Sequence, residues 1–375
     1  MQRRLSTWRY LLSQPILFSS TFALLNPRHN TLGGLAIQNA SSPKADTYGQ
    51  RFTLIATETQ DHLAQFSREV ENGLRQVPKR LPCRYFYDQE GSALFEAICA
   101  LPEYYLTRTE KTILEQRAAA IVSSFSEAIS LVELGSGSAV KTRLLIAALL
   151  RRQASLRYVP VDISRTALEE SAAGLLQDFP ALDILAIAGE YQSGLDYLKT
   201  RLHGPRLVLW LGSNVGNFER SEAASFLAQV RQALSSRDRL LVGIDLRKDR
   251  TILERAYDDS QGITAQFNRN ILAHINREFG AHFDLNRFEH RAVYNEEKGR
   301  IEMHLVSVCS QTVGLDRLEL EVDFAAGETI HTENSYKYSS AEIQTLATSA
   351  GLHLEQQFLD TAARFSVNLF APTTS

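Results

Sequence analysis

The sequence predicts an α/β fold built on a doubly wound, mostly parallel sheet, and three features indicate it. An apolar run at residues 131–134 is followed by Gly135-Ser-Gly137 and an apolar segment at 142–150. This order is typical of a buried strand, a tight turn and a helix. Further apolar runs alternate with helical segments, as in a parallel sheet. Two last runs, 354–359 and 365–370, are joined by a short loop and predict a terminal hairpin.

A ligand site is expected where the predicted strands end, because ligands of open parallel sheets bind beyond the carboxyl ends of the strands. The five strands are predicted at residues 131–134, 158–161, 184–188, 207–211 and 240–244. Glycine or polar residues follow the first four. The expected site therefore lies at this edge of the sheet.

The glycine turn favours a nucleotide without a pyrophosphate. Glycine allows a positive φ, and the helix that follows presents unpaired N–H groups. The dinucleotide fingerprint needs a third glycine, but Val140 stands there after Gly135 and Gly137, which argues against NAD. Asp162 ends the second strand and suits two ribose hydroxyls. Together these features suggest S-adenosylmethionine, and Glu133 is placed to hold its ammonium group, directly or through water.

The third and fourth strands end in further candidate residues. Glu190 could face the adenine amino group, and the Tyr191 ring could flank the base. The fourth strand runs into Leu211-Gly-Ser-Asn-Val-Gly-Asn217. Asn217 can serve a ligand, or it can cap the helix predicted at 221–234, since asparagine is a preferred N-cap. Both interpretations stay open from the sequence.

Composition restricts the partners. The 375 residues are 44% hydrophobic and carry a net charge of −3 with acids and bases interspersed. This content supports a large core and two closely joined domains. Without a broad basic field, neither nucleic acid nor an anionic membrane is an expected partner. We expect a monomer that acts on a small molecule.

The cysteines and histidines indicate neither disulfides nor a metal. Cys83, Cys99 and Cys309 form no CxxC pair, and the histidines, His304 and His331 among them, stand at no ligand spacing. We expect no metal and a reducing compartment, the cytoplasm.

Residues 1–50 have the composition of a tail. No acid precedes Asp46, and the apolar patch at 15–18 is too short to cross a bilayer. The arginines of this segment are Arg3, Arg4, Arg9 and Arg28. An import presequence has such a composition, but we favour a disordered leader.

Two regions outside the sheet are predicted to form a substrate-binding domain from residues 51–108 and 248–338. A helix is expected at 61–76, and tyrosine-rich loops follow it. Their tyrosines are either rim packing or site residues: Tyr85, Tyr87, Tyr104 and Tyr105. The domain with the parallel sheet and the expected S-adenosylmethionine site then comprises residues 109–247 and 339–371.

The second of these regions is predicted to hold helices, strands and a polar run. Helices are expected at 255–259 and 262–279. The alternating run at 300–308 is expected to pair with 318–324. The run at 328–337 is too rich in hydrogen-bonding groups for a core segment.

Eight ordered motifs resemble one family, the histidine Nα-methyltransferases of ergothioneine biosynthesis, which form hercynine from histidine. The resemblance covers about residues 81–370, and most of the motifs lie outside the cofactor fold. They are Phe86-Tyr-Asp88, Leu101-Pro-Glu-Tyr-Tyr105, Val132-Glu-Leu-Gly-Ser-Gly137, Leu211-Gly-Ser-Asn-Val-Gly-Asn217, Ala256-Tyr-Asp-Asp259, Phe267-Asn-Arg-Asn270, Arg300-Ile-Glu-Met303 and Thr332-Glu-Asn-Ser335. The resemblance implies a class I S-adenosylmethionine-dependent methyltransferase, with a Rossmann-like doubly wound sheet and an inserted α+β substrate-binding domain.

The resemblance also implies cofactor contacts. Gly135, with Gly137 in the same turn, Lys141 and Asp162 would bind S-adenosylmethionine. Glu190 and Tyr191 would lie at the adenine, where the family more often has an Asp-Phe pair.

Substrate contacts follow from the same resemblance. Asn217 and Tyr257 would hold the substrate carboxylate. Tyr104, Glu333 and Ser335 would address the imidazole. The remaining two are Tyr87, near the amine, and Met303, which would shape the side-chain pocket. Asn334 replaces an apolar family residue, but in a strand it would point away from the pocket.

These residue types suit methyl transfer, which requires alignment of a neutral amine and exclusion of water rather than a metal. We expect Tyr87 to orient the amine and tyrosine faces to attract the cationic product.

Three alternatives stay open. They are a related enzyme acting on tryptophan or a prenylated tryptophan, a silent domain that only binds S-adenosylmethionine, and an NAD oxidoreductase. Glu333 and Met303 favour histidine over tryptophan.

Overall fold

The computed structural model describes residues 45–47, 49, 51–56 and 62–373. The chain divides into two units, Met1–Ser42 and Pro43–Ser375, and the described residues all belong to the second. The leader predicted at 1–50 lies largely outside the described residues. Its described part differs from the prediction, because Ala45–Thr47 forms a strand paired with Thr53–Ile55.

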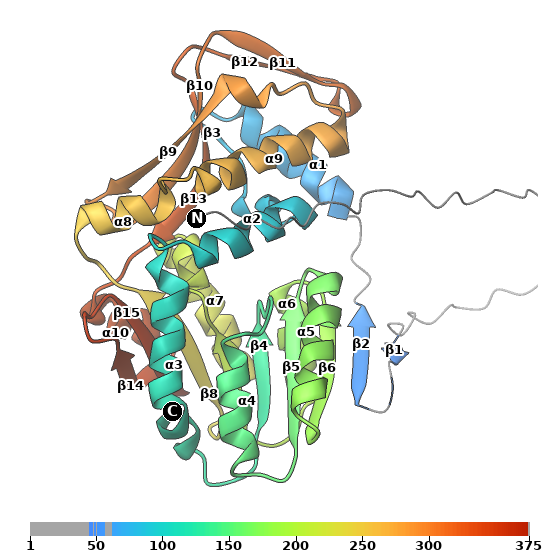
Figure 1. Cartoon of the computed structure of the whole chain (residues 1–375), viewed down its shortest axis with the longest axis vertical. Coiled ribbons are helices and arrows are strands. Elements are labelled where there is room, and N and C mark those ends of the chain that lie inside the picture. The colour runs from blue at the N-terminus through green and yellow to red at the C-terminus, as the bar shows by residue number, and fades with distance from the viewer. Residues whose placement is uncertain (1–44, 48, 50, 57–61, 374–375) are drawn as a thin grey trace, which may run out of the picture. The chain divides into compact units, whose positions relative to one another are not determined.

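The largest of the described sheets has nine strands (Figure 1). In spatial order its strands are β1 (Ala45–Thr47), β2 (Phe52–Ala56), β6 (Leu182–Ala188), β5 (Leu156–Asp162), β4 (Ser130–Leu134), β7 (Arg206–Trp210), β8 (Arg239–Asp245), β15 (Phe365–Pro372) and β14 (Leu352–Leu359). The strands β2, β6, β5, β4, β7 and β8 pair in parallel. The pairs β1–β2, β8–β15 and β15–β14 are antiparallel. The five predicted parallel strands and the terminal hairpin are confirmed.

One parallel strand was not predicted. β2 pairs with β6, so residues 52–56 are part of the nine-stranded sheet. The domain prediction placed them in the substrate-binding domain instead.

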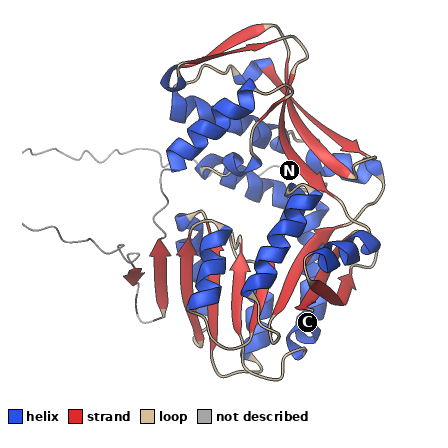
Figure 2. Cartoon of the chain, turned by 180° about the vertical axis from the view of Figure 1, so that it is seen from behind, coloured by secondary structure: helices blue, strands red, loops and turns tan. Residues whose placement is uncertain are grey.

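Helices cover both faces of the sheet and create two cores (Figures 1 and 2). On one face lie α3 (Tyr105–Ser123), α4 (Thr142–Leu150) and α5 (Arg165–Asp178), and on the other α6 (Tyr191–Thr200), α7 (Arg220–Ala233) and α10 (Ser340–Ser349). Alternate strand residues point to opposite faces. Leu131 accordingly belongs to the first core and Val132 to the second.

The remaining elements form an α+β region. Its four-stranded sheet contains β3 (Lys79–Arg80), β13 (Thr329–Tyr336), β10 (Arg300–Ser307) and β9 (Phe288–Asn295), and a separate hairpin contains β11 (Gln311–Leu315) and β12 (Leu320–Phe324). Its helices are α1 (His62–Arg75), α2 (Gln89–Ala100), α8 (Arg250–Tyr257) and α9 (Ile263–Phe279). Four 3₁₀ turns complete the described elements: η1 (Cys83–Phe86), η2 (Asn214–Asn217), η3 (Leu285–Arg287) and η4 (Asp316–Leu318).

The predicted pairing of residues 300–308 with 318–324 is wrong. β10 lies between β13 and β9, whereas β12 pairs with β11. The local hairpin closes over a four-residue connection at 316–319, and a short loop costs less entropy than a longer one.

The polar run at 328–337 is also more deeply placed than expected. Most of it forms β13, and Thr332, Ser335 and Lys337 are buried. Ladder bonds and side-chain partners satisfy these groups, so the polar composition does not prevent burial.

Helix boundaries differ in two places. α8 ends at Tyr257 instead of residue 259, because Asp259 accepts hydrogen bonds from the N–H groups of Gln261, Ile263 and Thr264 and so caps α9. α3 begins at Tyr105, so Tyr105, predicted in a tyrosine-rich loop, is helical.

Candidate active site

A pocket with about 490 Å³ of empty volume lies among elements of the α+β region and the loop after β7. Its lining residues are Tyr87, Phe95, Ile98, Tyr104, Gly212, Ser213, Asn214, Asn217, Ala256, Tyr257, Thr264, Phe267, Met303, Glu333 and Ser335. All seven side chains predicted to touch the substrate are in this set. Their individual roles stay predictions.

One wall of the pocket is a pair of hydroxyl groups. Tyr257 on α8 and Ser335 on β13 lie with their oxygens 2.7 Å apart. The buried Lys337 Nζ donates to both, at 3.0 Å and 2.8 Å. Glu333 and Ser335 share one face of β13 because strand side chains alternate. Asn334 is not in the lining and forms hydrogen bonds with Glu219 and His331 instead. This agrees with the prediction that its side chain points away from the pocket.

Aromatic rings form another part of the pocket lining. The Tyr87 ring meets Phe95 and Phe267 edge to face, with centroids 5.5 and 5.7 Å apart. Tyr104 lies 6.1 Å from Tyr257 by the same measure. Burial raises the pKa of the Tyr87 and Tyr104 hydroxyls well above its ordinary value. Both are therefore neutral phenols at physiological pH, suited to orienting a ligand rather than removing protons.

Glu333 supplies the acidic group of the pocket. Burial raises the pKa of its carboxyl from 4.5 to about 7, and the charge of Lys337 opposes part of that rise. Within the described residues the carboxylate has no hydrogen-bond partner from the protein, so its oxygens are free to accept from a ligand.

The predicted cofactor residues gather at the turn after β4. Gly135 and Gly137 have φ values of 74° and 47°, a conformation that side chains disfavour. The Gly137 N–H donates to Asp162 Oδ2 at 2.9 Å, and the Ser164 N–H donates to Asp162 Oδ1 at 2.9 Å. The neighbouring strand end therefore fixes both the turn and its carboxylate.

Glu133 lies behind this turn. It accepts a hydrogen bond from Thr142 Oγ1 at 2.6 Å and another from the Tyr158 hydroxyl. Burial raises its carboxyl pKa to about 7, and these two donors act in the opposite direction. A direct contact to a cofactor ammonium stays a prediction.

Lys141 forms an ion pair with Glu110 of α3. The Glu110 carboxylate also accepts from the Gly212 N–H at 3.0 Å, so it links the glycine turn to the loop after β7. Glu110 was not among the predicted site residues. A sequence signal existed, since Leu106, Ile113 and Leu114 place it on the apolar face of a helix.

Tyr191 lies over the glycine turn. Its hydroxyl would be 3.0 Å from a Cβ at Gly135, and its ring packs against Trp210 and Phe226 at 6.2 and 5.4 Å. Glu190 is exposed and forms the N-cap position of α6. Only Tyr191 of the pair therefore faces the turn closely.

The two groups of residues meet at the loop after β7. Asn214 lines the pocket, and its Nδ2 would be 3.4 Å from a Cβ at Gly135. Asn214 belongs to the motif at residues 211–217 but had no predicted role. The glycine turn and the pocket are thus neighbours, as a methyl donor and acceptor require.

The capping interpretation of Asn217 is wrong. α7 begins at Arg220 with Glu219 as its N-cap, and Asn217 ends η2 in the pocket lining.

The described residues contain no group of three or more His, Cys, Asp or Glu side chains that could hold a metal ion. Among the same residues, no helix is both long and apolar enough to cross a membrane.

The residues at the turn fit S-adenosylmethionine. A Cβ at Gly135 would crowd Tyr191 and Asn214, so the turn requires glycine there, and Asp162 offers a carboxylate suited to a ribose. With the sheet order, these features define a class I S-adenosylmethionine-dependent methyltransferase.

Comparison with known proteins specifies the family. Residues 66–372 match the family described as "Histidine-specific methyltransferase, SAM-dependent", and the chain belongs to this family.

Individual relatives support the same assignment. The chain is 43% identical over 302 residues to "Histidine N-alpha-methyltransferase" of Mycolicibacterium smegmatis, covering 80% of this chain and 93% of the relative. It is 42% identical to the protein of that name from Mycobacterium tuberculosis, covering 83% and 95%. "Ergothioneine biosynthesis protein 1" of Neurospora crassa is 33% identical over 73% of this chain, which spans 31% of that longer protein.

Asp162→Ala should weaken S-adenosylmethionine binding roughly tenfold to a hundredfold, because a carboxylate that accepts ribose hydroxyls is lost. Histidine affinity should change by less than about threefold, since Asp162 is outside the pocket lining. Calorimetric titration measures both. Asp183→Ala, whose carboxylate on β6 is 52% exposed, is the control. Unchanged cofactor affinity in Asp162→Ala would refute the ribose assignment.

Glu333→Gln should stabilise the ligand-free protein at high pH. A carboxyl pKa raised from 4.5 to about 7 on folding means that the folded state binds more protons between these values, so the free energy of unfolding falls as pH rises. The variant escapes this cost and should be more stable by on the order of 1–3 kcal/mol near pH 8.

Urea unfolding at about pH 5 and pH 8 measures the difference. It should shrink at the lower pH. The exposed Glu90→Gln should change stability by less than about 0.5 kcal/mol at both. Equal effects of Glu333→Gln at the two pH values would contradict the buried carboxylate.

Proposed function

We propose that this chain transfers methyl groups from S-adenosylmethionine to the α-amino nitrogen of L-histidine and forms the trimethylated betaine, hercynine, in ergothioneine biosynthesis. One observation carries the proposal: an acidic side chain without a protein partner among the described residues, Glu333, shares a pocket with the Tyr257 and Ser335 hydroxyls beside the glycine turn. The names of the relatives support the same substrate.

The polar groups of the pocket suit the two ends of histidine. The Glu333 carboxylate accepts an imidazole N–H, with Ser335 and Tyr104 beside it. Asn217 and Tyr257 hold the substrate carboxylate. Met303, which is 1% exposed, limits the space for the side chain and disfavours a larger indole.

The chemistry requires positioning more than proton transfer. When bound, S-adenosylmethionine supplies the electrophilic methyl carbon of its sulfonium group. The pocket holds the neutral amine in line with that carbon and excludes water. Tyr87, a neutral phenol, accepts a hydrogen bond from the amine and directs its lone pair, and bulk water takes the released proton.

The same pocket accommodates a growing cation. Each transfer enlarges the amine, and the last leaves a permanent positive charge. The rings of Tyr87, Phe95 and Phe267 meet at one wall, and aromatic faces attract a quaternary ammonium. This wall therefore suits the later intermediates as well as the first.

The setting we propose is the cytoplasm, with the chain acting as a monomer on a small molecule. Cys83, Cys99 and Cys309 are free, which suits a reducing compartment. One chain supplies the whole pocket lining, and the net charge of −3 favours neither nucleic acid nor an anionic surface.

The test is mass spectrometry of L-histidine incubated with the protein and S-adenosylmethionine, with L-tryptophan in a parallel tube. The proposal predicts histidine gaining three methyl groups and tryptophan unchanged. Methylated tryptophan alone would indicate the related enzyme. Cofactor binding without methylation of either would contradict the proposal and favour a silent binding domain.

A further inference from the structure

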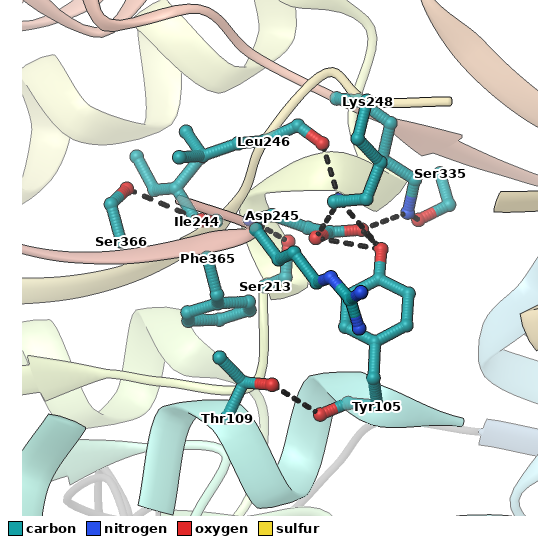
Figure 3. A network of polar contacts seen from close by, with 12 residues as sticks. Tyr105, Thr109, Ser213, Ile244, Asp245, Leu246, Lys248, Ser335, Phe365 and Ser366 are labelled. Carbon is teal, nitrogen blue, oxygen red and sulfur yellow. Dashed lines mark hydrogen bonds and ion pairs between the residues drawn. The ribbon is translucent and has the colours of Figure 1, made fainter. Parts of the chain in front are cut away.

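A buried charge network, drawn in Figure 3, contacts the pocket residues Tyr257 and Ser335 through Lys337. Asp245, at the end of β8, is 0% exposed. Its carboxylate contacts Lys337 Nζ at 2.9 Å, Lys248 Nζ at 2.6 Å and the Tyr105 hydroxyl at 2.8 and 2.9 Å. Two lysines therefore contact one buried carboxylate, although one ammonium group would be enough to neutralise it.

Lys337 joins this network to the pocket. An ammonium group has three N–H donors, and those of Lys337 reach Asp245, the Tyr257 hydroxyl and Ser335 Oγ at 2.9, 3.0 and 2.8 Å. The side chain is 0% exposed. All three donors are therefore used, and the two pocket hydroxyls must both accept from the same ammonium.

This arrangement determines what the hydroxyls offer a ligand. Because Tyr257 and Ser335 also bond to each other at 2.7 Å, one hydroxyl hydrogen is consumed between them. The other hydrogen is left to donate into the pocket, whichever residue carries it. Lys337 thus biases the pair toward donation, which suits an anionic acceptor.

The net charge of the network also favours an anionic ligand. One carboxylate and two ammonium groups leave one positive charge behind the hydroxyls. Burial lowers the Lys248 pKa to about 8, although Asp245 opposes this, while Asp245 and Tyr257 raise the Lys337 pKa against the effect of burial. Lys337 therefore stays charged over the whole physiological range.

We infer that Lys337 is a positioning residue that makes the pocket specific for the free carboxylate of an α-amino acid, acting through the Tyr257 hydroxyl. The inference rests on the proposed function, since it deepens the account of the same pocket. Neutralising the Asp245 carboxylate cannot be the only role of Lys337, because Lys248 and the Tyr105 hydroxyl already contact that carboxylate.

The experiment is a double-mutant cycle on L-histidine binding, measured by calorimetry with S-adenosylhomocysteine present. Lys337→Met should weaken histidine roughly tenfold to a hundredfold, the range expected for a charge-assisted hydrogen bond. In the Tyr257→Phe background the same change should cost less than about threefold, because the hydroxyl through which Lys337 acts is gone.

A control variant and the remaining ion pair separate function from folding. Lys79→Met removes another largely buried lysine, which pairs with Glu328 and is outside the pocket lining, so histidine affinity should change by less than about threefold. Lys337→Met leaves Asp245 paired with Lys248 and the Tyr105 hydroxyl, so the variant buries no unpaired charge. S-adenosylhomocysteine affinity near the wild-type value reports that each variant is folded.

Specificity gives the second readout. L-Histidinol lacks the carboxylate, so Lys337→Met should reduce the preference for L-histidine over L-histidinol by roughly tenfold. Additive effects in the cycle, or an unchanged preference, would overturn the inference while leaving the proposed function standing. Wild-type protein that binds no histidine would instead overturn the proposed function and, with it, this inference.

Discussion

The pocket depends on the buried Asp245 carboxylate. Burial raises its pKa, but Lys337 and Lys248 outweigh that effect and hold it below the ordinary 3.8. Through its side chain Asp245 connects β8 to α3 and to Lys337, the residue after β13. Its backbone N–H donates to Ser213 Oγ at 2.9 Å, which fixes the loop before η2. Elements of both sheets are thereby held around one ion cluster. Such a cluster contributes to stability only when fully paired, so the catalytic geometry and the folding of this region depend on the same contacts.

Several motif residues that resemble catalytic signatures support the pocket instead of lining it. Asp88 caps α2 through the Gly91 N–H at 2.7 Å and accepts from Asn270 and Arg277 on α9 at 2.7 Å each. Asn268 accepts from Thr332 at 2.7 Å and donates to the His304 carbonyl oxygen at 3.0 Å. These contacts fix α2, α9 and the four-stranded sheet relative to one another, which sets the distance between Tyr87 and Glu333. Part of the signature is therefore architectural.

The sequence predicted most of the parallel sheet because each buried strand is a short apolar run with a turn after it. It predicted the seven pocket residues through resemblance and not through geometry, since Tyr87, Tyr257 and Glu333 are far apart in the chain. The strand pairing of residues 300–308 was predicted wrongly because an alternating pattern indicates a strand but does not identify its neighbour, which is β13. Lys337 and Asp245 were not predicted because they act through an ion pair between residues 92 positions apart in the chain. The role of Asn217 could be decided only from the structure, in which Glu219 is the N-cap of α7.

The most direct test of the account is the structure of the protein with L-histidine and S-adenosylhomocysteine bound. The account predicts the imidazole against Glu333, the carboxylate within hydrogen-bonding distance of Asn217 and Tyr257, and the amine between Tyr87 and the sulfur. A histidine bound in the reverse direction, with its carboxylate beside Glu333, or one bound away from the glycine turn, would contradict it.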